Sequence, residues 1–246
     1  MNNGKQVTST ALEVQTPALE VQTTALEVQT TALEVQTTSL EDALRRGDGE
    51  NADAAAQAER AAEHLRSRIA QEGLADVSYD VVDSPFGTLL LAATKRGVVR
   101  LAFPEENVDQ VLDGLAQRLS PRIVQSSAPL ERARRELAEY FAGQRRSFGL
   151  TLDWALVGTF GQRVLRAASA IPYGGVLSYA QVASEAGSPR GSRAAGSALG
   201  ANPIPIVIPC HRVLRTGGAL GGYAGGLERK RWLLELEGAQ AGLGSI

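Results

Sequence analysis

The 246-residue sequence contains a single cysteine, Cys210, together with one methionine and two histidines, and only 5% of its residues are aromatic. One cysteine cannot form a disulfide within the chain, and it cannot supply the several thiolates of a typical structural zinc site. We therefore expect a reducing compartment, no bound metal ion and no other cofactor.

Long apolar segments are also absent from the sequence. No run reaches the roughly 18 apolar residues that a membrane-spanning helix needs, and the first residues lack the basic, apolar and small-residue order of a signal peptide. We therefore expect a cytoplasmic protein without membrane contact. Its length suffices for one or two globular domains with ordinary cores.

Charge is distributed unevenly along the chain, although the formal net charge is only −2. From Ala155 to the end there are nine basic and four acidic residues, a balance of +5, so the preceding residues carry −7. The basic part suits a polyanionic partner and the acidic part does not.

A seven-residue repeat, TALEVQT, occupies Thr10–Thr37. In a helix its alanines and valines would follow the spacing of a weak coiled-coil seam. A stable helix is disfavoured by Pro17, by the low helix propensity of threonine and valine, and by facing charges that are all glutamate. We interpret residues 1–53 as a disordered low-complexity tail and linker without a part in chemistry. The alanine-rich stretch Ala54–Gln71 then predicts a helical extension over residues 54–75.

From Val77 the pattern changes to short strands separated by turns. The segments VSYDVV, TLLLAAT and VVRLAF predict an antiparallel meander of three strands. The segments NVDQVLDGLAQRL and PLERARRELAEYFAG predict two helices, and SFGLTLDW predicts a return to strand. Residues 76–154 are therefore expected to form a small N-terminal α+β domain, in which no candidate catalytic cluster is visible.

Residues 155–240 predict a mostly helical domain. Capping boxes, in which a hydroxyl and an amide satisfy free backbone N–H groups, are predicted at Thr159 with Gln162 and at Ser178 with Gln181. The helix after the second box is short, and a glycine-containing turn and another helix follow it, which is the plan of a helix-turn-helix. The expected fold class of the chain is thus α+β, with a sheet domain followed by a helix-turn-helix domain that carries the cysteine.

The second helix of this motif, within RGSRAAGSALGAN, consists almost entirely of small residues. Because a glycine inside a helix costs roughly 1 kcal/mol relative to alanine, these glycines need a reason. Close approach of the helix backbone to a large partner is one, with Arg193 as the long side chain that projects. Tight packing of the helix against its own domain is the other, and the pattern does not decide between them.

The segment PIPIVIPCHRV joins the only cysteine, Cys210, directly to His211. A thiol becomes a strong nucleophile only when it loses its proton, and a histidine is a suitable base, although adjacent side chains usually need a bridging water or a tight turn to interact. Glu235 and Glu237 are candidates to orient the imidazole, since they occupy the last turn of a predicted helix, where the macrodipole disfavours acids. A buried, inert cysteine remains the alternative on chemistry alone.

The motif PCHRV (Pro209–Val213), preceded by NPIPIVI and followed by GGYAGGLERKRWLLELEG, resembles that of the O6-alkylguanine-DNA alkyltransferases, or methylated-DNA–protein-cysteine methyltransferases. The resemblance runs from about Thr159 to Gly238 and includes SYAQVA and SRAAGSALGANP. It implies DNA repair by direct reversal, in which a methyl or small alkyl group moves from O6 of guanine in duplex DNA to the protein's own cysteine. The reaction would occur once and irreversibly, after base flipping, and activity on O4-alkylthymine stays open.

The resemblance also assigns catalytic roles. It implies that Cys210 accepts the alkyl group and that His211 takes the thiol proton through water. Glu237, rather than its neighbour two residues earlier, aligns with the carboxylate that orients the histidine. Asn202 is similar to the asparagine that braces the cysteine turn, and Tyr179 to the tyrosine that donates a proton or hydrogen bond to the guanine.

The partner implied by the resemblance is double-stranded DNA containing O6-alkylguanine, and we expect a monomer. Arg193 resembles the finger that fills the space left by the flipped base. The other residues that the resemblance places at the DNA or in the alkyl and base pocket are Ser192, Ala194 and Tyr179 for DNA, and Val213, Tyr223, Ala224 and Pro205 for the pocket.

The sequence departs from the family pattern at three points. Gly200 stands where some relatives carry a basic residue, and Ala224 where some carry serine, so one phosphate contact and one side-chain contact to the base are expected to be missing. The cysteines and histidines that build an N-terminal zinc site in some members are absent.

Three other functions compete with alkyl transfer. A lesion-binding relative would lack the cysteine, and Cys210 argues against it. A helix-turn-helix regulator would carry an incidental cysteine, and a Cys-His-Glu hydrolase would turn over repeatedly with an oxyanion site that the sequence does not reveal. The fate of the alkyl group distinguishes all of them.

Overall fold

The computed structural model describes residues 50–72 and 74–239, so the heptad repeats lie outside the described residues. The predicted alanine-rich helix is confirmed as part of α2 (Glu50–Gln71), near whose end Arg68 pairs with Glu72 at 2.8 Å. The chain divides into two compact units between Arg60 and Ala61, and all the elements that follow α2 belong to the second unit. None of the described helices is long and apolar enough to cross a membrane.

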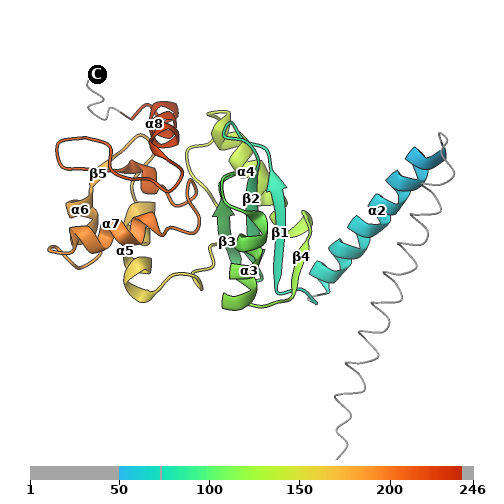
Figure 1. Cartoon of the computed structure of the whole chain (residues 1–246). Coiled ribbons are helices and arrows are strands. Elements are labelled where there is room, and N and C mark those ends of the chain that lie inside the picture. Colours follow the sequence, from blue (N-terminus) through green and yellow to red (C-terminus); the bar gives the residue numbers. More distant parts are fainter. Residues whose placement is uncertain (1–49, 73, 240–246) are drawn as a thin grey trace, which may run out of the picture. The chain divides into compact units, whose positions relative to one another are not determined.

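A four-stranded sheet, in the order β3-β2-β1-β4, forms the first part of this unit (Figure 1). The predicted antiparallel meander is confirmed, with β1 (Val77–Val82) paired to β2 (Leu89–Thr94) and β2 paired to β3 (Gly97–Ala102). The sequence did not predict β4 (Ile123–Gln125), which pairs parallel with β1 and is too short to show an alternating pattern.

The strand predicted for SFGLTLDW is wrong in extent. Only a parallel bridge joins Val98 to Leu152, supported by backbone hydrogen bonds from Val98 to Thr151 and from Asp153 to Val98. The segment therefore runs beside the sheet edge at Val98 without becoming a strand of the sheet.

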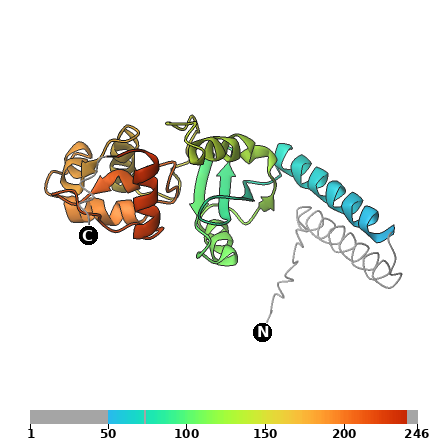
Figure 2. The ribbon, with the colours of Figure 1, turned by 90° about the horizontal axis from the view of Figure 1, so that it is seen from above.

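Two helices cover opposite faces of the sheet (Figure 2). Successive strand residues point to opposite faces, so Leu89 and Leu91 of β2 join the core that includes Leu137 of α4 (Glu131–Phe141). Leu90 packs on the other side in a second core with α3 (Val108–Arg118). Buried on both faces, β2 is apolar along most of its length.

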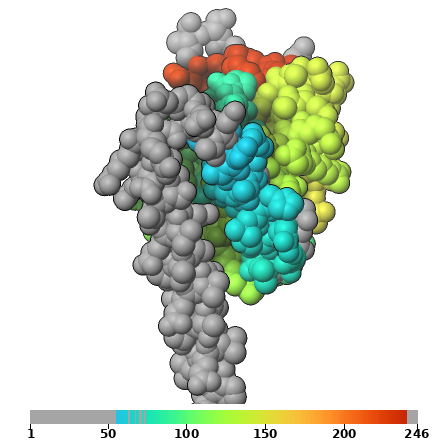
Figure 3. All heavy atoms as spheres, turned by 90° about the vertical axis from the view of Figure 1, so that its right-hand side faces the viewer, coloured from blue at the N-terminus to red at the C-terminus, as the bar shows by residue number. Residues whose placement is uncertain are grey.

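The outward face of α4 is charged, and Figure 3 shows α4 and the loop after it at the surface in yellow-green. Arg132, Arg135 and Glu131 are exposed, whereas Leu137 and Tyr140 on the opposite face are completely buried. This amphipathic pattern places Tyr140 against the second half of the unit.

The second half is helical, as predicted, and carries α5 (Thr159–Ser169), α6 (Tyr179–Glu185), α7 (Ser192–Gly200) and α8 (Leu227–Leu236). Their buried side chains continue the core that covers one face of the sheet. A short parallel pair, β5 (Leu177–Ser178) with β6 (Val213–Leu214), links the start of α6 to the cysteine loop.

The two predicted capping boxes have different outcomes. Ser178 and Gln181 form the predicted box at the start of α6. The box at Thr159 is wrong, because Gly158 is the N-cap of α5 and no side chain caps it. Gln162 instead turns back to donate its side-chain amide to the carbonyl of Val157 at 2.9 Å.

Candidate active site

Asn202 braces the loop that presents the cysteine. Its Nδ2 donates to the carbonyl of Ile208 at 2.9 Å and to Sγ of Cys210 at 3.1 Å, and its Oδ1 accepts from the N–H of Ile204 at 3.0 Å. Between them, Ile206 is completely buried and has φ of 74°, a left-handed conformation that a β-branched residue adopts only under strain. Such strain persists where the surroundings over-determine the backbone, and Asn202 supplies these restraints.

The thiol of Cys210 lies at the start of the 3₁₀ turn Cys210–Arg212 and is only 5% exposed. Burial raises its pKa to about 11, although the hydrogen bond from Asn202 and the charge of Lys230 act in the opposite direction. The resting thiol is therefore protonated at neutral pH, and a reaction at sulfur requires a base.

His211 is completely buried and places Nε2 3.0 Å from Oε1 of Glu237. Burial lowers the pKa of His211 and raises that of Glu237, but hydrogen bonds from His211 and Arg212 outweigh burial and bring the Glu237 pKa to about 2. An ionised carboxylate can only accept, so Nε2 carries the hydrogen and Nδ1 presents a lone pair. Within the described residues, Nδ1 has no hydrogen-bond partner.

Glu237 is the C-cap of α8, and its carboxylate accepts hydrogen bonds from the side chains of His211, Arg212 and Tyr140. Arg212 forms a bidentate pair with it, Nε to Oε2 and Nη2 to Oε1, both at 2.8 Å. The phenol of Tyr140 donates to Oε1 at 2.6 Å. Glu237, rather than the exposed Glu235, is the predicted carboxylate, whereas Arg212 and Tyr140 are not among the predicted site residues.

Lys230 is a further residue that the sequence analysis missed. It is completely buried, and its Nζ donates to the carbonyls of Val213 at 2.6 Å and Gly221 at 3.2 Å. The ammonium lies 5.9 Å from the ring centroid of Tyr179, and burial lowers its pKa to about 8. A Cβ at Gly221 would collide with the phenol of Tyr179, so a larger residue there would displace this ring.

Tyr179 stands at the start of α6, half-buried, with its hydroxyl 3.3 Å from the carbonyl of Gly222. Burial and the neighbouring Cys210 raise the pKa of this phenol above its usual value. Tyr179 therefore remains a hydrogen-bond donor at neutral pH, on the same side of the fold as the thiol.

Two family descriptions match the chain: "6-O-methylguanine DNA methyltransferase, ribonuclease-like domain" over residues 77–154, and the "DNA binding domain" of the same name over residues 159–239. A methylated-DNA–protein-cysteine methyltransferase of Mycolicibacterium paratuberculosis is 40% identical over 162 residues, which are 65% of this chain and 92% of that protein. This chain belongs to the 6-O-methylguanine DNA methyltransferase family.

Other members of this methyltransferase family extend the comparison. A protein of the same name from Salmonella typhimurium is 52% identical over 104 residues, covering 42% of this chain and 60% of that protein. The crystal structure of Mycobacterium tuberculosis OGT in complex with DNA matches with 40% identity and a TM-score of 0.57, covering 67% of this chain and 94% of that chain.

The helix-turn-helix of this methyltransferase consists of α6 and α7. Arg193 and Ala194 are exposed near the start of α7, and Ser192 is partly exposed beside them. Among the described residues, nothing outside the backbone of α7 and the two neighbouring residues lies within 4 Å of a Cβ built at Gly200, and a Cβ at Gly196 would make only ordinary contacts at 3.7 Å. Packing against its own domain therefore does not require these two glycines.

The predicted pocket residues differ in their burial. Val213 and Pro205 are buried, Ala224 is exposed, and the ring of Tyr223 stands at 87° to that of His211 with centroids 6.3 Å apart. The buried hydroxyl of Tyr223 has no partner within the described part of the chain.

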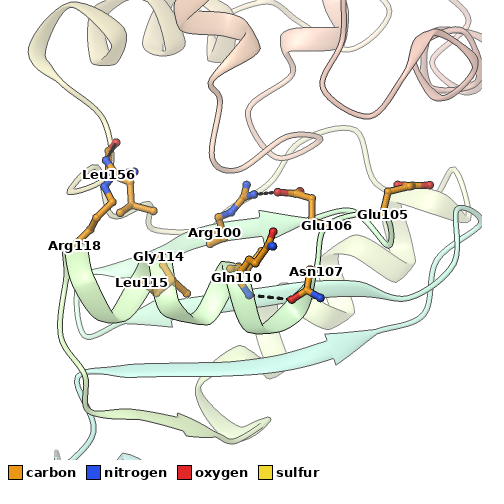
Figure 4. A pocket seen from close by; sticks show the side chains of 10 residues that line it. Arg100, Glu105, Glu106, Asn107, Gln110, Gly114, Leu115, Arg118 and Leu156 are labelled. Carbon is orange, nitrogen blue, oxygen red and sulfur yellow. Dashed lines mark hydrogen bonds and ion pairs between the residues drawn. The ribbon is translucent and has the colours of Figure 1, made fainter.

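A cavity of about 390 Å³ lies elsewhere, beside α3 in the first half of the unit (Figure 4). Figure 4 shows Arg100 paired with Glu106 at its rim, and no cysteine or histidine lines it. It is therefore lined by neither a thiol nor an imidazole and is separate from the Cys210 site. Within residues 50–72 and 74–239, no group of three or more His, Cys, Asp or Glu residues could hold a metal ion.

Proposed function

We propose that this protein repairs DNA by direct reversal, transferring a methyl or other small alkyl group from O6 of guanine in duplex DNA to Sγ of Cys210. The observation that carries the proposal is a buried thiol adjacent in sequence to an imidazole whose Nε2 is hydrogen-bonded to Glu237 and whose Nδ1 has no hydrogen-bond partner among the described residues. A thiol, a base and an orienting carboxylate are the groups that this displacement needs. Relatives named for this activity support it at 40% identity.

In the proposed reaction the thiol proton passes through water to Nδ1 of His211, and the thiolate attacks the alkyl carbon. The S–C bond forms as the C–O6 bond breaks, and the electron pair leaves on the guanine, which Tyr179 neutralises with a proton or hydrogen bond. Glu237 stabilises the imidazolium. Since thiol exchange does not reverse a thioether, each molecule acts once.

A buried thiol cannot reach an atom inside a stacked duplex, so the base must be rotated out at a cost of a few kcal/mol. In this proposal α7 lies in the minor groove, where its small residues let the backbone approach and Arg193 fills the vacated space. Ser192 and Ala194 contact the DNA backbone at the start of α7. Phosphate contacts carry no base code, so binding depends little on sequence. The proposed acting species is a cytoplasmic monomer whose residues 155–240 carry the chemistry.

Intact-protein mass spectrometry tests the reaction. After incubation with duplex DNA carrying O6-methylguanine, the protein should gain the mass of one methylene group, because CH₃ replaces the thiol proton, and guanine should be restored. Peptide mapping should place the added mass on Cys210, the only cysteine. Restored guanine with an unchanged protein mass would indicate a hydrolase, and an unreacted lesion would contradict alkyl transfer altogether.

Arg193→Ala should separate thiol chemistry from base flipping. The rate of transfer from free O6-benzylguanine should be unchanged, because Arg193 is exposed and its carbonyl accepts a hydrogen bond from Ser197 within the same helix. The rate on duplex DNA should fall roughly 10- to 100-fold, since the variant no longer stabilises the extruded base. Single-turnover rates on both substrates provide the measurement.

The control for this variant is Arg231→Ala, which removes an equal charge from an exposed position on α8. It should leave both rates within about twofold of wild type, because a surface charge outside the contact acts only through screened electrostatics. Equal losses on the free base and the duplex in Arg193→Ala would argue against the finger role.

A further inference from the structure

Tyr140 reaches the reaction centre from the other half of the unit. It belongs to α4, which packs on the sheet, and its ring is buried among Phe148 and Tyr173 with centroid distances of 5.2 Å and 6.3 Å. Its hydroxyl donates to Oε1 of Glu237 at 2.6 Å, and 97 residues of sequence separate the two side chains. The aromatic cluster thus aims one phenol at the carboxylate that holds His211.

The phenol competes with His211 for a single oxygen. Oε1 of Glu237 accepts from Tyr140, from Nε2 of His211 at 3.0 Å and from Nη2 of Arg212 at 2.8 Å. Burial, followed by the charge of Glu237, raises the pKa of Tyr140 far above its usual value, so the phenol remains a donor. Its hydrogen offsets part of the carboxylate charge that the imidazole would otherwise experience.

We propose that Tyr140 is a positioning residue for alkyl transfer, supplied from α4, which fixes the Glu237 carboxylate and sets how readily His211 accepts the thiol proton. This inference rests on the proposed function. The Tyr140 hydroxyl donates to Glu237 and not to the thiol or the imidazole, so it acts through Glu237. The sheet half of the protein therefore contributes to the chemistry through one hydrogen bond.

The sign of the effect follows from the charges around the pair. Arg212 and Lys230 both disfavour protonation of His211, while Glu237 favours it. The thiol of Cys210 and the phenols of Tyr173 and Tyr223 are further titratable groups near these residues, and Arg146 and Arg229 act on the two phenols. Removing the Tyr140 hydroxyl leaves all of them in place and frees Oε1, so His211 should become more basic.

Tyr140→Phe tests the inference through the pH dependence of transfer. The rate of transfer from O6-methylguanine DNA falls as acid protonates His211, because neutral His211 is the base. In Tyr140→Phe the midpoint of this fall should lie about one pH unit higher than in wild type. The rate below both midpoints should fall up to tenfold, and the plateau should stay within about threefold of wild type. A merely structural role would lower the rate by one factor at every pH.

A second readout does not depend on activity. The chain has only two histidines, His211 and the exposed His64, so histidine-selective ¹⁵N labelling gives one reporter and one internal reference. In Tyr140→Phe the Nε2–H proton of His211 should move downfield as its bond to Oε1 strengthens, and the His64 signals should not move.

The matched control is Tyr173→Phe, since this phenol belongs to the same cluster but donates to the backbone carbonyl of Leu236 at 2.9 Å. It should change neither the pH midpoint nor the His211 resonance. If Tyr140→Phe fails to fold, 3-fluorotyrosine at position 140 replaces it; as a stronger donor, it should shift the acid limb in the opposite direction, to lower pH.

Three outcomes would overturn the inference. Tyr140→Phe could give a pH profile that superimposes on wild type after scaling by one factor, or Tyr173→Phe could shift the midpoint equally, or 3-fluorotyrosine could leave it in place. In each case wild type would still acquire the methyl group, and the proposed function would stand. If wild type acquires no methyl group, the proposed function fails, and the inference fails with it.

Discussion

Cys210→Ser should bind duplex DNA carrying O6-methylguanine and remove no methyl group from it. A serine hydroxyl fits the site, because the Asn202 amide that donates to Sγ at 3.1 Å can donate to Oγ equally well. The hydroxyl is a far weaker nucleophile than the thiolate and needs a stronger base than His211. Transfer should therefore fall more than about 1,000-fold, as measured by the mass gain of the protein and by the methyl group left in the DNA.

The binding measurement makes this variant informative. Its affinity for the lesion duplex should stay within about threefold of wild type, because the exposed residues of α7 are unchanged. Loss of transfer with binding retained would identify Cys210 as the acceptor. A Cys210→Ser protein that still demethylates DNA at the wild-type rate would instead make this cysteine an inert core residue.

Local sequence patterns predicted the elements of this fold where a pattern is long enough to be read. Each strand of the meander has six residues, most of them apolar or β-branched, and the Ser178 box has both partners in place. The prediction was wrong or missing for two short segments, the capping box at Thr159 and strand β4. Thr159 is the first residue of α5, one position after the N-cap, so its side chain does not cap the helix. Strand β4 has only three residues and depends on β1 for its hydrogen bonds.

The active-site residues likewise divide into those that the local sequence predicts and those that it does not. Asn202, Cys210 and His211 are close in sequence, and their arrangement follows from one loop. Glu237 was chosen through a resemblance, and its bond to His211 is now observed. The Tyr140 contact could not be predicted, because a buried phenol gives the same sequence signal whether or not it meets a carboxylate in the folded chain.

Glu237→Gln should have the second largest effect, because it leaves a buried charge without its counter-ion. Arg212 is 6% exposed, and apart from Glu237 the guanidinium reaches the carbonyl of Ile171 at 2.6 Å. Breaking a buried pair in this way typically costs about 3 kcal/mol or more. The melting temperature should fall by roughly 6–12 °C, and transfer should slow at least about 100-fold, since nothing then stabilises the imidazolium.

The pH dependence of this cost identifies its origin. A carboxyl group whose pKa is lower in the folded protein than in the unfolded chain stabilises the fold above the unfolded value and loses that effect as the pH falls toward the folded value. For Glu237 these values are 4.5 and about 2. The stability gap between wild type and Glu237→Gln should therefore be constant from pH 7 to pH 6 and narrow by about 1.4 kcal/mol at pH 3.5, as measured by urea unfolding.

Glu235→Gln is the matched control, since Glu235 carries the same charge two residues away but is exposed. Its unfolding free energy should stay within about 0.5 kcal/mol of wild type at both pH values, and its transfer rate should be unchanged. A gap for Glu237→Gln that stays the same at pH 7 and pH 3.5 would mean that the loss comes from packing. A gap that narrows with acid would show that the ionised carboxylate itself, held by Arg212, His211 and Tyr140, joins the cysteine loop to the end of α8.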